Sequence, residues 1–151
     1  MGYVTPRLSD VAASVAEDYD EAGEYVKLYR PEGEIDFICS GWLTPNPYRP
    51  EQVLRRTVNV ETPAEIIAKK VHHRAATFKA RDLFDLATVF ERDPHELGPI
   101  VPVVQGRRQE LEERIESRRA SLQDEFDALD LFDTTRSLDD CIEALQRLLR
   151  A

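Results

Sequence analysis

The pattern of apolar and polar positions divides the chain into an N-terminal part with mixed spacing and a C-terminal part with helical spacing. Residues 7–23 carry apolar side chains at intervals of three and four, which predicts a helix that stops near Gly23. Residues 24–30 and 34–40 are β-rich runs separated by Pro-Glu-Gly, the pattern of a hairpin. Residues 55–61 alternate and predict a third strand, after a proline-containing loop over 41–51.

The strand predicted over 34–40 has two chemically different faces. Because side chains alternate along a strand, Ile35 and Phe37 share one face with Cys39. Asp36 lies on the other face, with Glu34 and Ile38. The strand therefore offers one carboxylate in the middle of a small sheet.

From residue 62 onward the spacing predicts helices only. Thr62 is a candidate N-cap, Pro63 suits the first helical position, and Glu65 completes a capping-box pattern. Further helices are predicted over 81–93, 94–101, 107–129 and 137–150. The order of elements indicates an α+β fold: a partial sheet of about three strands (1–61) and then a C-terminal helical bundle (62–151), forming one continuous domain.

Composition and charge narrow the function classes. Hydrophobic residues make up 42% of the chain and charged residues 32%, typical of a soluble protein, and no apolar run reaches the length of a membrane span. We expect a cytoplasmic protein without membrane contact. The net charge of −9 argues against a general nucleic-acid-binding protein. Residues 55–81 are the exception, with seven basic and two acidic side chains.

The cysteines and histidines do not predict a metal site. Cys39 and Cys141 are too few for a zinc site or a disulfide framework, and we expect both in small apolar positions. His72 and His73 are adjacent, so they point in different directions on a helix, and with His95 they are expected at the surface. Trp42 is interpreted as a core or loop anchor rather than a base-stacking residue.

A helical wheel separates the two adjacent lysines of the segment "EIIAKKVHHRAATFKARDLFDL". Ile66, Ile67 and Val71 define the apolar side; Lys70 falls within it, whereas Lys69 falls on the opposite side and is expected to face water. On the next helix Asp82 lies on the flank of the apolar face. A short connection predicts an antiparallel helix pair.

That helix pair would bring Lys70 within reach of Asp82, with Asp85 one step further round. Two interpretations stay open. The pair could be a structural ion pair between helices, or a lysine and a carboxylate held in a cleft to bind a triphosphate and a metal. Lysine suits phosphate oxygens as a compact charge, and carboxylates suit magnesium.

Residues 55–92 resemble the second half of AbiEii-type nucleotidyltransferases, the toxin components of bacterial abortive-infection and type IV toxin–antitoxin systems. The resemblance consists of a strand, a "TP-x-E-(apolar)₂-A-x-K" helix, a downstream arginine and "RD-x-x-DL". The matching positions here are Thr62, Pro63, Glu65, Lys70, Arg74, Arg81, Asp82, Asp85 and Leu86.

The resemblance implies a nucleotidyltransferase fold with a helical bundle, and transfer of a nucleotide from an NTP, with Mg²⁺, to an RNA acceptor such as a tRNA 3′ end. It implies catalytic roles for Lys70 and Asp82 and substrate binding by Arg74, Arg81 and Asp85. Asp36 is the implied metal ligand. An antitoxin protein is a possible partner.

The family's first motif, a Gly-Ser or Gly-Gly-Thr turn before a strand with paired acidic residues, is not found ahead of the predicted hairpin. We therefore expect a truncated toxin-component homologue that is inactive alone. The alternative is a catalytically dead remnant that binds protein or RNA.

Overall fold

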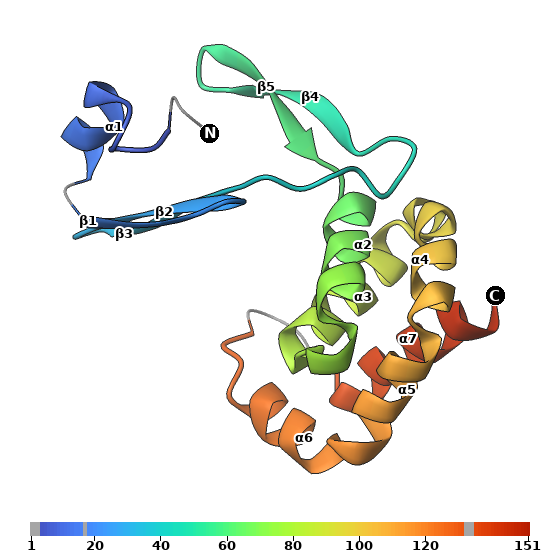
Figure 1. Cartoon of the computed structure of the whole chain (residues 1–151). Helices are drawn as coiled ribbons and strands as arrows, with labels where there is room; N and C mark the ends of the chain where they lie inside the picture. Colours follow the sequence, from blue (N-terminus) through green and yellow to red (C-terminus); the bar gives the residue numbers. More distant parts are fainter. Residues whose placement is uncertain (1–3, 17, 132–134) are drawn as a thin grey trace. The chain divides into compact units, whose positions relative to one another are not determined.

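Two units of different architecture make up the chain, residues 1–41 and 42–151. The structure is a computed structural model that describes residues 4–16, 18–131 and 135–151. Helices and strands occur together in an α+β fold with the helical bundle at the C-terminal end, which confirms the predicted fold class (Figure 1). The division at Gly41 places the second hairpin with the helices; the domain boundary expected at residues 61 and 62 stays a prediction.

The first unit is a short helix and a three-stranded antiparallel sheet. The helix α1 (Asp10–Val15) is capped by Ser9, and the sheet has the order β1–β2–β3, with β1 (Asp18–Ala22), β2 (Tyr25–Arg30) and β3 (Gly33–Ile38). The β2–β3 hairpin was predicted. The prediction of a long helix over 7–23 was wrong, because residues 18–22 pair with β2. Tyr19 packs against the small core of this unit, formed by Ala16, Val26 and Leu28.

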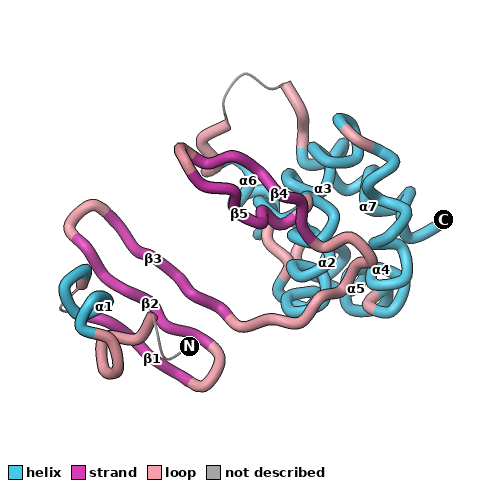
Figure 2. Tube along the Cα trace, turned by 90° about the horizontal axis from the view of Figure 1, so that it is seen from above, coloured by secondary structure: helices cyan, strands magenta, loops and turns pink. Residues whose placement is uncertain are grey.

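The second unit opens with a two-stranded hairpin, β4 (Tyr48–Val53) and β5 (Arg56–Glu61), seen from above in Figure 2. The sequence predicted β5 but not β4, because Pro50 and the two prolines before it indicated a loop. Pro50 is tolerated since a two-stranded ribbon has only edge strands. Most residues of the hairpin are exposed, so packing contributes little to its stability.

Helices form the rest of the second unit. α2 (Pro63–Arg74) is followed by a 3₁₀ turn, η1 (Ala75–Thr77), and by α3 (Ala80–Arg92). The remaining elements are η2 (Pro94–Ile100), α4 (Val101–Gly106), α5 (Arg108–Ser117), α6 (Arg119–Asp127) and α7 (Leu138–Arg150). The core between them includes Ile67, Leu83, Leu86, Leu111 and Leu145.

The charged helix predicted over 107–129 is interrupted at Arg118. In one straight helix, Leu111 and Leu122 would lie about 16 Å apart along the axis. The break between α5 and α6 lets both side chains enter the same core, where they are fully buried. Packing therefore overrides the uninterrupted helical pattern.

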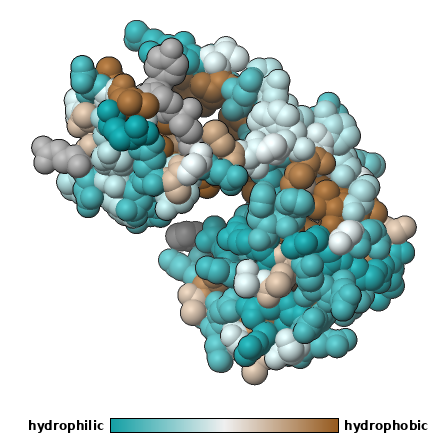
Figure 3. Space-filling view, viewed as in Figure 1, coloured by the Kyte–Doolittle hydropathy of each residue, from teal (hydrophilic) through white to brown (hydrophobic). Residues whose placement is uncertain are grey.

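The two cysteines occupy different environments. Cys141 lies in the helical core, as predicted, and burial raises the pKa of its thiol to about 11, which suits a packing role. Cys39 is exposed, so the prediction of an apolar position for it was wrong. The face of the molecule shown in Figure 3 is mainly hydrophilic, with small apolar patches. No helix among the described residues is long and apolar enough to cross a membrane.

Candidate functional site

The helix pair α2–α3 brings Lys70 and Asp82 together. The Lys70 Nζ lies 3.1 Å from Asp82 Oδ1, and the carboxylate of Asp82 is almost fully buried. The other carboxylate oxygen of Asp82 accepts a hydrogen bond of 3.2 Å from the backbone N–H of Lys79, at the start of α3. This bond fixes the Asp82 side chain, so Lys70 meets a carboxylate in a defined position.

Three further charged residues surround this pair. Lys70 Nζ donates to Asp85 Oδ2 at 2.5 Å, and Arg74 Nη2 lies 3.3 Å from Asp82 Oδ1. Arg81 Nε lies 3.5 Å from Asp85 Oδ1. The five positions predicted on these two helices thus form one cluster with three cations and two carboxylates. Its single excess positive charge suits an anionic ligand better than a metal ion.

The exposure of the side chains increases across the cluster. The Asp82 side chain is 3% exposed, that of Lys70 17%, and those of Arg74 and Arg81 42% and 66%. The ammonium of Lys70 is therefore paired with the buried carboxylate of Asp82 and still lies near solvent. A ligand approaching from solvent would meet the two arginines first and Lys70 behind them.

Lys69 does not face water, contrary to the helical-wheel prediction. Its side chain is only 15% exposed, and its ammonium forms ion pairs with Glu61 at 2.5 Å and with Glu65 at 3.6 Å. Ile66, assigned to the apolar side, is 41% exposed instead. The buried side of α2 is thus rotated toward Glu65 and Ala68, because a polar loop packs there.

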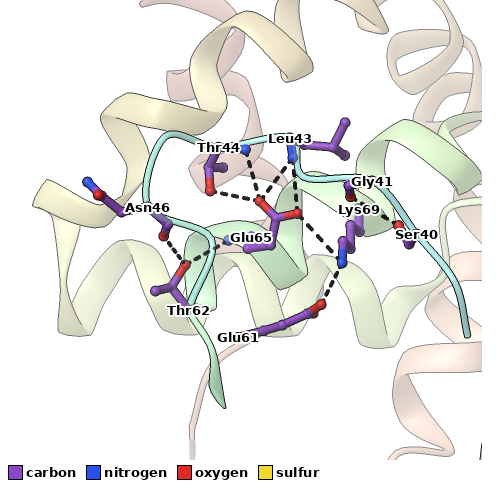
Figure 4. A network of polar contacts seen from close by, with 9 residues as sticks. All are labelled: Ser40, Gly41, Leu43, Thr44, Asn46, Glu61, Thr62, Glu65 and Lys69. Atoms are coloured by element: carbon purple, nitrogen blue, oxygen red, sulfur yellow. Dashed lines mark hydrogen bonds and ion pairs between the residues drawn. The ribbon is translucent and has the colours of Figure 1, made fainter. Parts of the chain in front are cut away.

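That loop is held by Glu65, which is fully buried (Figure 4). Its carboxylate accepts hydrogen bonds from the backbone N–H groups of Leu43 and Thr44, at 2.9 to 3.2 Å, and from the Thr44 hydroxyl at 2.7 Å. The Thr62 hydroxyl accepts from the Glu65 N–H as an N-cap should. Only this half of the expected capping box is therefore present.

The anchoring role of Glu65 was not predicted from the sequence. A glutamate at the third helical position has a local explanation, so its spacing gives no reason to look elsewhere. The partners lie 21 and 22 residues earlier, in a segment without a recognisable pattern. Only the tertiary structure brings them together.

Asp36 lies in the other unit, on β3. Its register partner on β2 is Lys27, and the Lys27 Nζ lies 3.6 Å from Asp36 Oδ1 and 2.7 Å from Glu34. The hydrogen bond from Lys27 to Glu34 raises the pKa of the lysine. On the same face the Tyr29 hydroxyl donates to Asp20, which raises the pKa of the tyrosine to about 12. The predicted face alternation of β3 is observed.

A magnesium site needs carboxylate oxygens that are available to the ion. The carboxylates of Asp82 and Asp85 are each contacted by two cationic side chains, and Asp36 is paired with a lysine. Within the described ranges, no three His, Cys, Asp or Glu side chains are grouped so that they could hold a metal ion. The residues present here therefore do not fit a magnesium site by themselves.

Comparison with known proteins identifies the class first. Residues 13–150 match a family model that describes a nucleotidyl transferase toxin. The family is AbiEii, "Nucleotidyl transferase AbiEii toxin, Type IV TA system", and the chain belongs to it. The resemblance seen in the sequence is thus confirmed. Searches of curated proteins and of solved structures gave no match.

Proposed function

We propose that this chain supplies the lysine-bearing part of a nucleotidyltransferase site that transfers a nucleotide from an NTP to the 3′ end of an RNA such as tRNA. The proposal rests on the position of Lys70: its ammonium forms ion pairs with Asp82 and Asp85 on α3 and lies close to solvent. Arg74 lies beside it. Membership of the AbiEii family supports the reaction class.

In this reaction the 3′-hydroxyl oxygen of the RNA attacks the α-phosphorus of the NTP. The bond from that phosphorus to the bridging oxygen breaks, pyrophosphate leaves, and the hydroxyl proton passes to solvent. Lys70 contacts phosphate oxygens and stabilises the charge that develops on them. Asp82 and Asp85 hold the lysine in place, and Arg74 and Arg81 attract the triphosphate at the exposed edge of the cluster.

We further propose that these residues do not catalyse the transfer alone. Metal-assisted transfer needs converging carboxylates, and those on α3 are engaged by cations. Asp36 as a metal ligand is part of this proposal, with its remaining partners in a Gly-Ser/Asp-x-Asp segment. An antitoxin protein is the expected regulatory partner, and the cytoplasm, where NTPs and tRNA occur, is the expected location.

The test is a label-transfer assay. The chain is incubated with Mg²⁺, each labelled NTP and total tRNA, with and without a polypeptide that carries the family's Gly-Ser/Asp-x-Asp motif, joined ahead of residue 1 or added separately. The proposal expects transfer only with the added motif. Loss of that transfer in Lys70→Ala, but not in Lys79→Ala, would support the role of Lys70, because Lys79 is an exposed lysine nearby. No transfer in either condition would refute the enzyme interpretation.

The alternative is a binding module without catalysis. It is favoured by the closed set of ion pairs around Lys70, which satisfies a purely structural role equally well, and by the basic stretch over 55–81. In that case Lys70→Ala would leave RNA or antitoxin binding intact, and no motif-bearing polypeptide would restore transfer.

A further inference from the structure

Trp42, on the loop that leads into β4, and Tyr48, the first residue of β4, form an exposed aromatic pair. Their ring centroids lie 5.6 Å apart with the planes inclined by 55°. Trp42 is 59% exposed and Tyr48 43%. Trp42 was interpreted as a core or loop anchor; a core position is wrong, since most of its surface faces solvent, and its place on a loop agrees with the other half of that interpretation.

The loop that carries this pair is fixed at both ends. Directly after Trp42, the N–H groups of Leu43 and Thr44 donate to the buried carboxylate of Glu65. Just before Tyr48, the Pro47 carbonyl accepts from the Thr62 N–H at 2.9 Å. Figure 4 shows the contacts of Glu65 with Leu43 and Thr44, and the Thr62 hydroxyl donating to the Asn46 carbonyl, which tie the loop to the start of α2. The backbone that carries the exposed rings is thus ordered before a ligand binds, which lowers the entropic cost of binding.

The surroundings of the pair are charged. The Lys69 ammonium lies 4.9 Å from the centroid of the Trp42 ring, and Glu61 pairs with the same lysine. Lys70, the proposed catalytic residue, is the next residue on α2. At the turn between β4 and β5, Arg55 and Arg56 are exposed and form no ion pair within the described part of the chain.

We propose that Trp42 and Tyr48 stack on unpaired bases at the 3′ end of the RNA acceptor. This inference rests on the proposed function, because it names the binding site for one of its substrates. Exposed aromatic rings beside cations are the arrangement by which proteins hold single strands: every base has a flat face, and Lys or Arg meets the backbone. An apolar protein segment would instead have to lie beside the Lys69 ammonium, which sits over the Trp42 ring and is paired with Glu61, and these charges oppose that.

The pair and Lys70 are both attached to α2. Lys69 lies next to the Trp42 ring, and Lys70 is the following residue of the same helix, pointing about 100° further round. A strand stacked on Trp42 would therefore have to turn around α2 to bring its 3′ end to the lysine that contacts the NTP. Because Glu61 offsets the charge of Lys69, stacking and not phosphate attraction should dominate the affinity at this point.

Trp42 is the only tryptophan of the chain, so its fluorescence reports on this site directly. The full chain is titrated with a single-stranded RNA octamer and with an octamer of the same length whose sugars are abasic. The proposal expects saturable quenching with the first and not with the second. Equal quenching by both would overturn it, since the abasic strand keeps the phosphates and lacks the bases.

Substitutions give a second measurement, by anisotropy of a fluorescein-labelled octamer. Trp42→Ala should weaken binding at least about fivefold, as expected for a lost base stack, and Trp42→Phe should recover part of the loss. Tyr25→Ala, at a tyrosine of similar exposure on β2, is the control and should leave the affinity unchanged. Unchanged affinity of Trp42→Ala, with thermal unfolding as in the wild type, would refute the site.

The outcome is separable from that of the proposed function. RNA binding that depends on Trp42 without any label transfer would keep the site and remove the enzyme interpretation. Label transfer with the same KM for RNA in Trp42→Ala and in the wild type would keep the enzyme interpretation and remove the site.

Discussion

Two buried carboxylates on neighbouring helices, Glu65 on α2 and Asp82 on α3, are neutralised in opposite ways. Glu65 is surrounded mainly by fixed donors, two backbone N–H groups and a hydroxyl, with Lys69 further away at 3.6 Å. Asp82 has one backbone donor and two cations, Lys70 and Arg74, on long flexible side chains. Glu65 thus anchors a loop, whereas Asp82 positions the two cationic side chains of Lys70 and Arg74.

The difference separates structure from candidate chemistry. Donors that belong to the backbone cannot turn toward a ligand, so the region around Glu65 is expected to be rigid. A lysine or an arginine can exchange a carboxylate partner for a phosphate oxygen by a change of rotamer. Burial of a carboxylate alone therefore does not identify a functional residue. A buried carboxylate whose partners are flexible cationic side chains is the better candidate.

The largest expected effect is the loss of Glu65. In Glu65→Ala the N–H groups of Leu43 and Thr44 lose their acceptor, and Lys69 loses one of its two carboxylate partners. We expect the free energy of unfolding to fall by about 3–5 kcal/mol, as measured by urea denaturation. Glu61→Ala is the control, because Glu61 is half-exposed, and should cost less than about 1 kcal/mol. Similar losses in both variants would remove the special role of Glu65.

A smaller loss is expected at the second carboxylate. Asp82→Ala removes the side-chain acceptor for the Lys79 N–H, while Lys70 keeps its contact with Asp85. The expected cost is about 2 kcal/mol. Asp85→Ala should cost below about 1 kcal/mol, since Asp85 is partly exposed. If Asp82→Ala destabilised the protein as strongly as Glu65→Ala, the two regions would not differ as described.

A smaller effect still tests the anchoring of the loop. Thr44→Val keeps the shape of the side chain and removes the hydroxyl that donates to Glu65 at 2.7 Å. Because the acceptor is charged, about 1–2 kcal/mol should be lost. Thr44→Ser, which keeps the hydroxyl, should melt close to the wild type in a thermal scan. Equal melting of the Val and Ser variants would show that the hydroxyl contributes nothing.

The sequence predicted the parts of this account that rest on helical periodicity. The spacing of α2 and α3 was sufficient to bring Lys70 to Asp82, because a short connection forces two such helices to pack together. It was not sufficient for Lys69 and Glu65, since the wheel has no information about the polar loop that covers their side of α2. The strand β1 was missed for a similar reason: Tyr19 fits a helical spacing, and only pairing with β2 reveals the strand.

The decisive measurement for the role of Lys70 is label transfer by the Lys70→Met variant in the presence of the motif-bearing polypeptide. Methionine keeps the length of the side chain, and the buried carboxylate of Asp82 keeps Arg74 and the Lys79 N–H as partners, so the variant should remain folded; a thermal scan of the same sample checks this. The account predicts a folded protein whose transfer is lost. Transfer at the wild-type rate would contradict it and would leave the Lys70–Asp82 pair with a structural role only.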